Sequence, residues 1–166
     1  MYTIRTATVN DVETIRQIAD QTWWVTYGPI LEKEQIDFML SEIYSASKIR
    51  AQIENNVQIY LLLLEDEQPV AFASYSPREE NVEIYKLHKL YCLPQIQGKG
   101  YGKILINQVA QKTMDAGKDV LELNVNRYNN AKTFYEKMGF AIAYEEDIAI
   151  GPYWMNDYVM RKELTS

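Results

Sequence analysis

Apolar residues recur along the chain at two spacings, one typical of helices and the other of strands. We expect the first helix to start at a capping box formed by Asn10 and Glu13 and to end before Gly28. Its inward face holds Val12, Ile15, Ile18 and Ala19. Four further helices are predicted over residues 32–43, 45–55, 101–116 and 130–138. Apolar runs and alternations predict strands over residues 2–7, 57–64, 70–75, 82–93, 119–125, 140–148 and 153–161.

The order of these elements predicts the class of the fold. A chain of 166 residues is long enough for one domain, 1–166. Its mixture of strands and helices indicates an α/β (α+β) fold with a mixed seven-stranded sheet and four to five flanking helices. Residues 82–125 form a strand–helix–strand unit, which has to be a right-handed crossover. Ligands of such sheets bind near strand carboxyl ends and helix N-termini, so the loop after residue 93 is the first place to look for a site.

Composition excludes several kinds of chemistry. The single cysteine, Cys92, and the single histidine, His88, leave no internal disulfide, no CxxC motif and no histidine-based metal site. Residues 1–10 lack a signal-peptide pattern, and no apolar run reaches the roughly 18 residues of a membrane span. These features predict a cytoplasmic protein without a membrane partner. The net charge of −6 argues against nucleic-acid binding and suits cationic small molecules, although it also simply favours solubility.

Three of the seven glycines fall within one loop between a predicted strand and a predicted helix. Gly98, Gly100 and Gly102 allow consecutive backbone N–H groups to turn toward one anion, at the positive end of the helix dipole. A pyrophosphate suits such a loop. The spacing is neither that of a dinucleotide-binding fingerprint nor that of a Walker loop. A plain strand-to-helix turn is the alternative interpretation.

Two sequence motifs resemble those of one enzyme superfamily. The stretch LHKLYCLPQIQGKGYGKILI, residues 87–106, resembles the coenzyme A motif of the GCN5-related N-acetyltransferase (GNAT) superfamily, with Gln97, Gly100 and Gly102 at its defining positions. Residues 134–140, FYEKMGF, resemble the second landmark of that superfamily, in the matching order along the chain. The resemblance implies a GNAT-like fold and acetyl transfer from acetyl-CoA, without a metal, to an amine acceptor.

The resemblance also implies which residues contact the coenzyme and the leaving thiolate. The loop amides would hold the pyrophosphate, a splayed strand would pair with the pantetheine arm, and Asn130 would add a further contact. Tyr128 stands where the family often has asparagine, so the last assignment departs from the pattern. The implied coenzyme-binding residues are Tyr91, Cys92, Leu93, Gln97, Gly98, Lys99, Gly100, Tyr101, Gly102 and Asn130. Tyr135 would protonate the departing thiolate; packing against neighbouring aromatic residues is the other interpretation of this side chain.

Acetylation of an amine also needs a group that takes up a proton, because a free primary ammonium has a pKa near 10.4. His88 is the only residue whose ordinary pKa lies near 7, so it is the candidate base. A water chain or a carboxylate such as Glu83 remains an alternative, and so does a histidine without a role. A backbone N–H near Cys92 is the candidate for holding the thioester oxygen.

Aromatic and acidic residues near both ends of the chain suggest a cationic acceptor. Trp23, Tyr27, Trp154 and Asp157 could bind an ammonium through cation–π and ionic contacts, or could belong to the core and a solvated hairpin. Residues 22–35 and 150–160 resemble the PaiA-type polyamine acetyltransferases, which implies a spermidine- or spermine-like acceptor. A peptide or protein N-terminal or lysine acetyltransferase, and a non-catalytic acyl-CoA-binding module, are the alternatives. Relatives that dimerise through their last strands leave a homodimer open.

Overall fold

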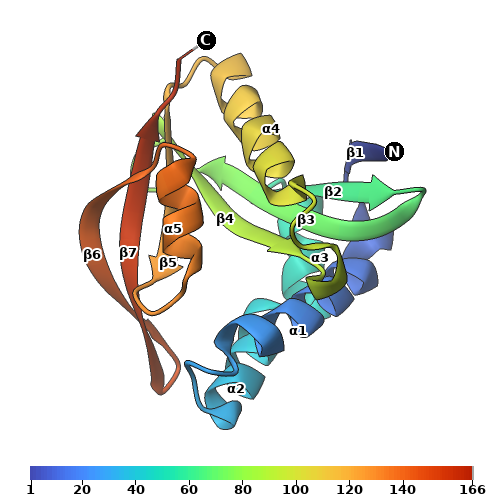
Figure 1. Ribbon diagram of the computed structural model, residues 1–166, viewed down its shortest axis with the longest axis vertical. Coiled ribbons are helices and arrows are strands. Elements are labelled where there is room, and N and C mark those ends of the chain that lie inside the picture. The colour runs from blue at the N-terminus through green and yellow to red at the C-terminus, as the bar shows by residue number, and fades with distance from the viewer. Residues whose placement is uncertain (166) are drawn as a thin grey trace.

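The computed structural model describes residues 1–165, and its elements follow the predicted order (Figure 1). The strands are β1 (Tyr2–Thr6), β2 (Ile59–Glu65), β3 (Gln68–Pro77), β4 (Ile84–Cys92), β5 (Val120–Asn126), β6 (Ala141–Ile150) and β7 (Tyr153–Glu163). The helices are α1 (Val12–Tyr27), α2 (Lys33–Ile43), α3 (Ala46–Glu54), α4 (Tyr101–Asp115) and α5 (Ala131–Lys137), with short 3-10 helices at Val9–Asp11 and Pro94–Ile96. No helix in this described part is long and apolar enough to cross a membrane.

The seven strands form one mixed sheet in the order β1-β2-β3-β4-β5-β7-β6, which confirms the predicted fold class. All neighbouring strands are antiparallel except β4 and β5, which are parallel and joined through α4. The crossover and the glycine-rich loop at its start are therefore central to the sheet.

The sheet opens where β4 and β5 separate. These strands pair only from Ile84 with Val120 to Leu87 with Leu123, although β4 continues to Cys92 and β5 to Asn126. Their carboxyl-terminal halves consequently leave a gap at the centre of the sheet. Because α4 begins just beyond β4, the gap lies beside the N-terminus of that helix (Figure 1).

A bulge in β4 changes which side chains face each side of the sheet. Ser74 of β3 pairs with Lys89 and the next residue pairs with Leu87, so His88 is an extra residue. Beyond the bulge, Leu90 packs with Leu87 on the α4 side of the sheet. Lys89 instead faces the rings of residues 44 and 60 on the opposite side.

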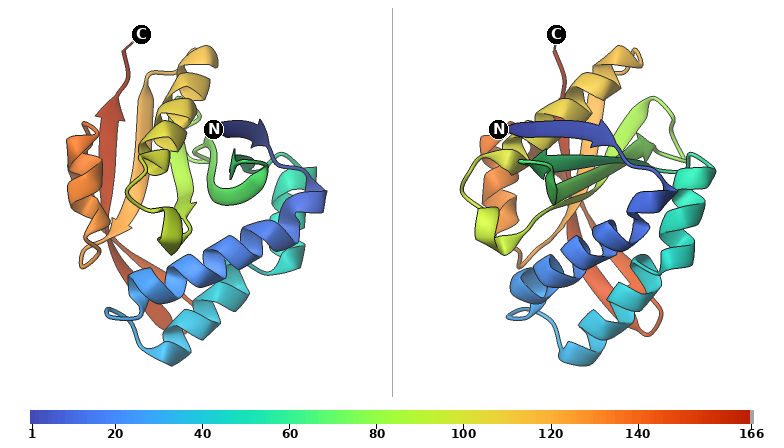
Figure 2. Two further views of the ribbon diagram at one scale, coloured as in Figure 1. Left: turned by 45° about the vertical axis from the view of Figure 1, so that its right-hand side comes forward. Right: turned by 90° about the vertical axis from the view of Figure 1, so that its right-hand side faces the viewer.

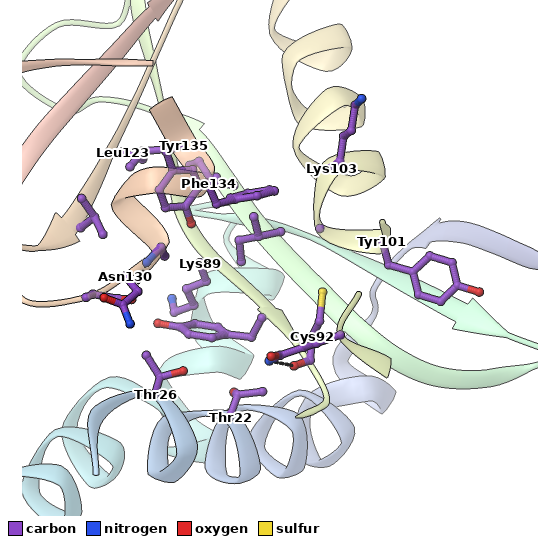
Figure 3. A pocket seen from close by; sticks show the side chains of 18 of the residues that line it. Thr22, Thr26, Lys89, Cys92, Tyr101, Lys103, Leu123, Asn130, Phe134 and Tyr135 are labelled. Carbon is purple, nitrogen blue, oxygen red and sulfur yellow. Dashed lines mark hydrogen bonds between the residues drawn. The ribbon is translucent and has the colours of Figure 1, made fainter. Parts of the chain in front are cut away.

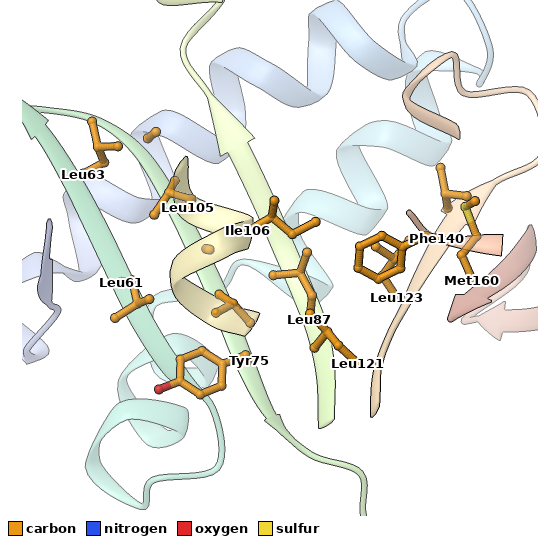
Figure 4. Close-up of a cluster of buried hydrophobic side chains, with 14 of the residues drawn as sticks. Leu61, Leu63, Tyr75, Leu87, Leu105, Ile106, Leu121, Leu123, Phe140 and Met160 are labelled. Carbon is orange, nitrogen blue, oxygen red and sulfur yellow. The ribbon is translucent and has the colours of Figure 1, made fainter. Parts of the chain in front are cut away.

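Two hydrophobic clusters cover the two faces of the sheet. Alternate residues of β2 divide between them: Leu61 and Leu63 join the cluster that includes α4, whereas Tyr60 and Leu62 join the cluster that includes α1, α2 and α3. Figure 2 shows the first three helices together on one side of the molecule, and Figure 4 shows the α4 cluster. Each face is thus closed by its own helices, and the gap between β4 and β5 connects the two.

The start of the first helix differs from the prediction. The capping box is formed by Thr8 and Asp11, which cap the 3-10 helix, rather than by Asn10 and Glu13. Asp11 is buried and both of its oxygens accept hydrogen bonds from Arg5 at 2.8 Å. This partner on β1 could not be seen from local spacing, and it explains why the cap lies two residues earlier.

Candidate functional site

The glycine-rich loop after β4 has the backbone geometry of an anion site. Gly98 and Gly100 have φ values of +94° and +83°, a region that side chains rarely adopt, and each has open space around it. Gly100 precedes the first residue of α4 and supplies no side-chain cap. The N–H groups of the first turn of α4 therefore have no partner within the helix and carry the positive end of its dipole. This exposed cradle fits a pyrophosphate.

Two side chains of the loop are held away from this cradle. Lys99 Nζ lies 2.9 Å from a carboxylate oxygen of Glu65, at the end of β2, and the Tyr101 hydroxyl donates to the same oxygen. Those hydrogen bonds, the tyrosine's first, lower the pKa of Glu65, and the carboxylate raises the pKa of Tyr101 to about 12. Figure 3 shows the Tyr101 ring pointing away from the cavity. Glu65 thus anchors the side chains of the loop, and the backbone N–H groups of the loop remain free to bind an anion.

A cavity of about 710 Å³ extends from this loop into the gap between β4 and β5 (Figure 3). Its walls come from α1, β4, the loop, α4, β5 and the start of α5. At the mouth, a methyl group added to Gly102 would lie 3.6 Å from Phe134 Cζ and 3.8 Å from Cys92 Sγ. The cavity is therefore an elongated channel with an anion cradle at one end and the separated strands along its length, which suits a nucleotide with a long acyl-bearing arm.

Tyr135 lies partly buried in the wall of this cavity, on α5. Its ring meets those of Phe134 and Phe140 edge-on, at 5.3 Å and 6.1 Å between centroids. Burial, and then the proximity of Tyr27 and Cys92, raise the pKa of the phenol above its usual value. The hydroxyl is thus protonated at neutral pH and directed into the cavity (Figure 3), so packing and proton donation are compatible for this residue.

His88 occupies the bulge of β4 and lines two cavities, the one described above and a second of about 740 Å³. Its Nε2 lies 2.6 Å from Ser76 Oγ. Burial lowers the pKa of His88 to about 3, and the nearby cations Lys86, Lys89 and Arg78 add to the shift. The imidazole is therefore neutral at pH 7 and a weak proton acceptor.

Polar side chains connect the two cavities on the β5–β7–β6 side of the gap. Asn124 lines the first cavity and its Nδ2 donates to Glu146 at 3.0 Å and to Asp157 at 3.2 Å. Glu146 lines the second cavity. Asp157 is 6% exposed, burial raises its pKa, and its Oδ1 has no hydrogen-bond partner among the described residues. A desolvated carboxylate with an unpartnered oxygen thus lies behind Asn124, which itself lines the first cavity.

The structure brings most of the predicted site residues to the first cavity. Those lining it are Tyr27, His88, Tyr91, Cys92, Gln97, Gly98, Gly100, Tyr101, Gly102, Asn130 and Tyr135. The others lie elsewhere: Leu93 beside the 3-10 helix, Lys99 on the outer side of the loop, Trp23 in the core, Trp154 with 58% of its surface exposed, and Asp157 behind Asn124. Trp23 still touches the cavity wall indirectly, because its ring centroid lies 4.4 Å from that of Tyr27.

Several lining residues were not among the predicted site residues, and the polar ones include Lys89, Asn124 and Thr26. Lys89 and Asn124 lie on strands that were predicted. The alternation of apolar and polar residues in those strands did not by itself indicate that either side chain would line a site. The separation of β4 from β5 is what exposes them to the cavity. Glu122 and Asn124 are the two polar residues of the VLELNV stretch, and the polarity of Asn124 within it was the available signal.

Comparison with known proteins agrees with this geometry. The model of the protein family described as "Acetyltransferase (GNAT) domain" matches residues 29–158. The chain is 29% identical to the spermidine N(1)-acetyltransferase of Thermoplasma acidophilum, over 98% of both chains. It is also 31% identical to the [ribosomal protein bS18]-alanine N-acetyltransferase of Haemophilus influenzae, over 48% of this chain and 53% of that one. The crystal structure of the PaiA N-acetyltransferase from Thermoplasma acidophilum in complex with coenzyme A superposes with a TM-score of 0.83 at 26% identity, covering 98% of this chain and 99% of that one. The chain belongs to the GNAT family of acetyl-CoA-dependent N-acetyltransferases.

Proposed function

We propose that this N-acetyltransferase acetylates a primary amine of a small, polyamine-like molecule. The observation that carries the proposal is Asp157, a buried carboxylate with one unpartnered oxygen that lies directly behind Asn124 in the wall of the first cavity. Lys86 and Arg127 act on this carboxylate only from beyond ion-pair distance. A buried charge without a counterion in contact is costly, and an ammonium group would supply both the charge and the missing donor. The 29% identity to a spermidine N(1)-acetyltransferase supports an acceptor of this class.

The coenzyme is assigned to the first cavity. The pyrophosphate would bind the backbone N–H groups from Gln97 to Gly102, at the start of α4, while Lys99 exchanges Glu65 for a phosphate oxygen. The pantetheine arm would lie along the unpaired edge of β4 at Tyr91, Cys92 and Leu93, with Asn130 on the facing wall. Acetyl-CoA, when bound, supplies an activated thioester at the far end of this arm.

Tyr135 is assigned the transfer of a proton to the leaving sulfur. Its hydroxyl lines the coenzyme cavity and is close enough to Cys92 for the thiol to raise the pKa of the phenol. Because burial holds the phenol protonated, it can donate without prior ionisation. Backbone N–H groups of the unpaired part of β4 can stabilise charge on the thioester oxygen.

The acceptor is assigned to the side of the gap that carries Asp157. Tyr27 would face the amine from α1, with Trp23 stacked behind it as a positioning residue. Trp154 is exposed on β7 and its carbonyl accepts a hydrogen bond from Gln35, so it would contact only the outer end of a long acceptor. Glu146 shares Asn124 with Asp157 and provides a second carboxylate for a second ammonium.

A protein acceptor is the competing candidate function. The relative that acetylates the alanine of ribosomal protein bS18 is 31% identical over 80 residues, which is about half of each chain. An acidic acceptor site would also suit a basic peptide. A non-catalytic acyl-CoA-binding role would retain the cradle but not require a buried carboxylate behind Asn124.

The experiment that tests the proposal measures coenzyme A release with a panel of acceptors. Spermidine, spermine, a lysine-containing peptide and an alanine-starting peptide are compared at equal concentration. We expect turnover with the polyamines, and Asp157→Asn should raise KM for spermidine by about 10- to 100-fold, as expected for losing a hydrogen bond to a charged group. Glu163→Gln, at the end of β7, is the matched control with unchanged KM. Turnover with peptides alone would refute the polyamine assignment, and tight coenzyme A binding without any turnover would support a binding module.

A further inference from the structure

Lys89 is a buried lysine at the inner end of the coenzyme cavity. It is 6% exposed, and Figure 3 shows it at the end of the cavity away from Tyr101 and Lys103. Its Nζ donates to Gln58 Oε1 and to Tyr60 Oη, each at 2.9 Å. These two bonds leave one of the three positions around the nitrogen without a protein acceptor among the described residues.

The charge of Lys89 is not balanced by an acid. Within residues 1–165, no carboxylate oxygen lies within the 4.0 Å of an ion pair with its Nζ. The faces of Tyr44 and Tyr60, at 5.6 Å and 5.2 Å, stabilise the charge besides the hydrogen bonds. Burial, and then the positive charge of Lys86, lower the pKa of Lys89 to about 7. A buried lysine of this kind can release and take up a proton at neutral pH.

The other titratable groups of the cavity are unsuited to accept a proton at neutral pH. The pKa of His88 is held at about 3 and its Nε2 is engaged by Ser76. The thiol of Cys92 has its pKa raised to about 11 by burial. Burial likewise raises the pKa values of the lining phenols Tyr27, Tyr91 and Tyr135. Lys103 is exposed at the coenzyme end. Asp157 lies behind Asn124 and does not line the cavity, so Lys89 is left as the titratable group in the cavity wall that can act as a base.

We propose that Lys89, rather than His88, is the general base that takes the proton of the attacking amine. In this step the amine nitrogen bonds to the thioester carbon and the C–S bond breaks. The amine proton passes to the neutral Nζ of Lys89 at its free position, and the sulfur receives the proton of Tyr135. Lys89 then returns its proton to solvent and Tyr135 regains one. The inference rests on the acetyl transfer described above but not on the identity of the acceptor.

A transition near pH 7 can be assigned to Lys89 only if the titratable groups around it have different pKa values. Tyr44, after α2, and Tyr60, on β2, face its Nζ. Lys86 and His88 on β4 act on it electrostatically, and Tyr91 on β4 and Tyr27 on α1 line the same cavity. The four tyrosines have pKa values raised above their usual range, and that of His88 lies near 3. Lys86 has its pKa lowered as well, mainly by burial, and lines the second cavity. A variant at Lys86 is therefore needed to assign any transition near pH 7.

The test compares pH profiles of kcat/KM for the wild type, Lys89→Arg, Lys89→Met and Lys86→Met. Any amine that the enzyme accepts can be used, and two acceptors with different ammonium pKa values separate their ionisation from that of the enzyme. We expect kcat/KM to fall as the pH drops through about 7. This transition should be common to both acceptors and should persist in Lys86→Met. Lys89→Arg keeps a positive charge but cannot lose its proton, so its kcat should fall about 10²- to 10⁴-fold with coenzyme A affinity unchanged. Lys112→Met, at an exposed position of α4, is the control with wild-type activity.

Direct titration keeps the proposal falsifiable if Lys89→Met does not fold. In wild-type protein carrying 13Cε-labelled lysine, one resonance should titrate near pH 7 and be missing from Lys89→Arg. This measurement needs no acceptor, so it is distinguishable from a failure of the polyamine assignment. A Lys89 resonance that titrates above pH 9, or a Lys89→Arg enzyme within about threefold of wild-type kcat with its transition near pH 7 intact, would overturn the proposal.

Discussion

A substitution at Gly102 should change coenzyme A affinity and the thermal stability of the fold in opposite directions, so the two effects can be measured separately. Gly102 lies in the first turn of α4, its φ is not positive, and a methyl group there would meet its nearest neighbours at ordinary contact distances of 3.6 Å and 3.8 Å. Alanine should therefore fit without strain. Since glycine costs about 0.5–1 kcal/mol relative to alanine in a helix, Gly102→Ala should raise the Tm of the free protein by about 1–4 °C.

The same methyl group should weaken coenzyme binding. It would enter the turn whose N–H groups are assigned to the pyrophosphate, where a phosphate oxygen has to approach the backbone closely. Losing one hydrogen bond to a charged group costs about 1.5–3 kcal/mol, which corresponds to an affinity for coenzyme A lower by about 10- to 150-fold. The assays are thermal unfolding without ligand and calorimetric titration with coenzyme A.

Gly117 provides the opposite control for this pair of measurements. It follows α4 with a φ of +80° and lies outside the first cavity. Gly117→Ala should lower stability by roughly 1–2 kcal/mol, because alanine is strained in that conformation, and should leave coenzyme A affinity unchanged. A Gly102→Ala protein that is more stable yet binds coenzyme A like the wild type would show that the first turn of α4 does not hold the pyrophosphate.

Three further predictions concern the acid, the sheet and the thiol. Tyr135→Phe should lower kcat by about 100-fold with little change in Tm, since only a hydroxyl is removed; steady-state thiol release measures this, and unchanged kcat would contradict the acid role. Glu122 is 1% exposed and pairs with two arginines beside the parallel strands, so Glu122→Gln should destabilise the protein by about 3–5 kcal/mol in urea unfolding; a loss below about 1 kcal/mol would refute a stabilising network. Because the pKa of Cys92 is raised to about 11, its thiol should react with iodoacetamide far more slowly at pH 8 than an ordinary thiol, and faster as pH rises; rapid labelling at pH 8 would contradict its burial in the cavity wall.

The strands and helices were largely predictable because their signals are local. The three glycines marked the start of α4, and the apolar alternations gave strands close to their observed bounds. The first helix cap was misplaced because Asp11 is held by Arg5, a partner on another element. Spacing along one segment cannot reveal such a contact.

The predicted site residues divide in the same way. Gly98, Gly100 and Tyr135 lie at the cavity because their positions follow from the loop and helix that contain them. The acceptor residues were harder to place, since Trp154 proves exposed and Asp157 proves buried although the two lie on one strand. Which face of β7 meets the gap depends on its pairing with β5, and that pairing is a long-range contact.

What the sequence by itself determined is the donor side of this enzyme: the order of elements, the glycine-rich cradle and the motifs that identify the family. These depend on backbone propensities and on residues close together in the chain. Only the tertiary structure decided which side chains line the gap beside that cradle. The early separation of β4 from β5 opens the cavity, and the bulge at His88 turns Lys89 into the α1 side of the sheet. Desolvation in that interior then shifts the pKa values of Lys89 and Asp157, because the cost of burying a charge depends on neighbours that folding brings together.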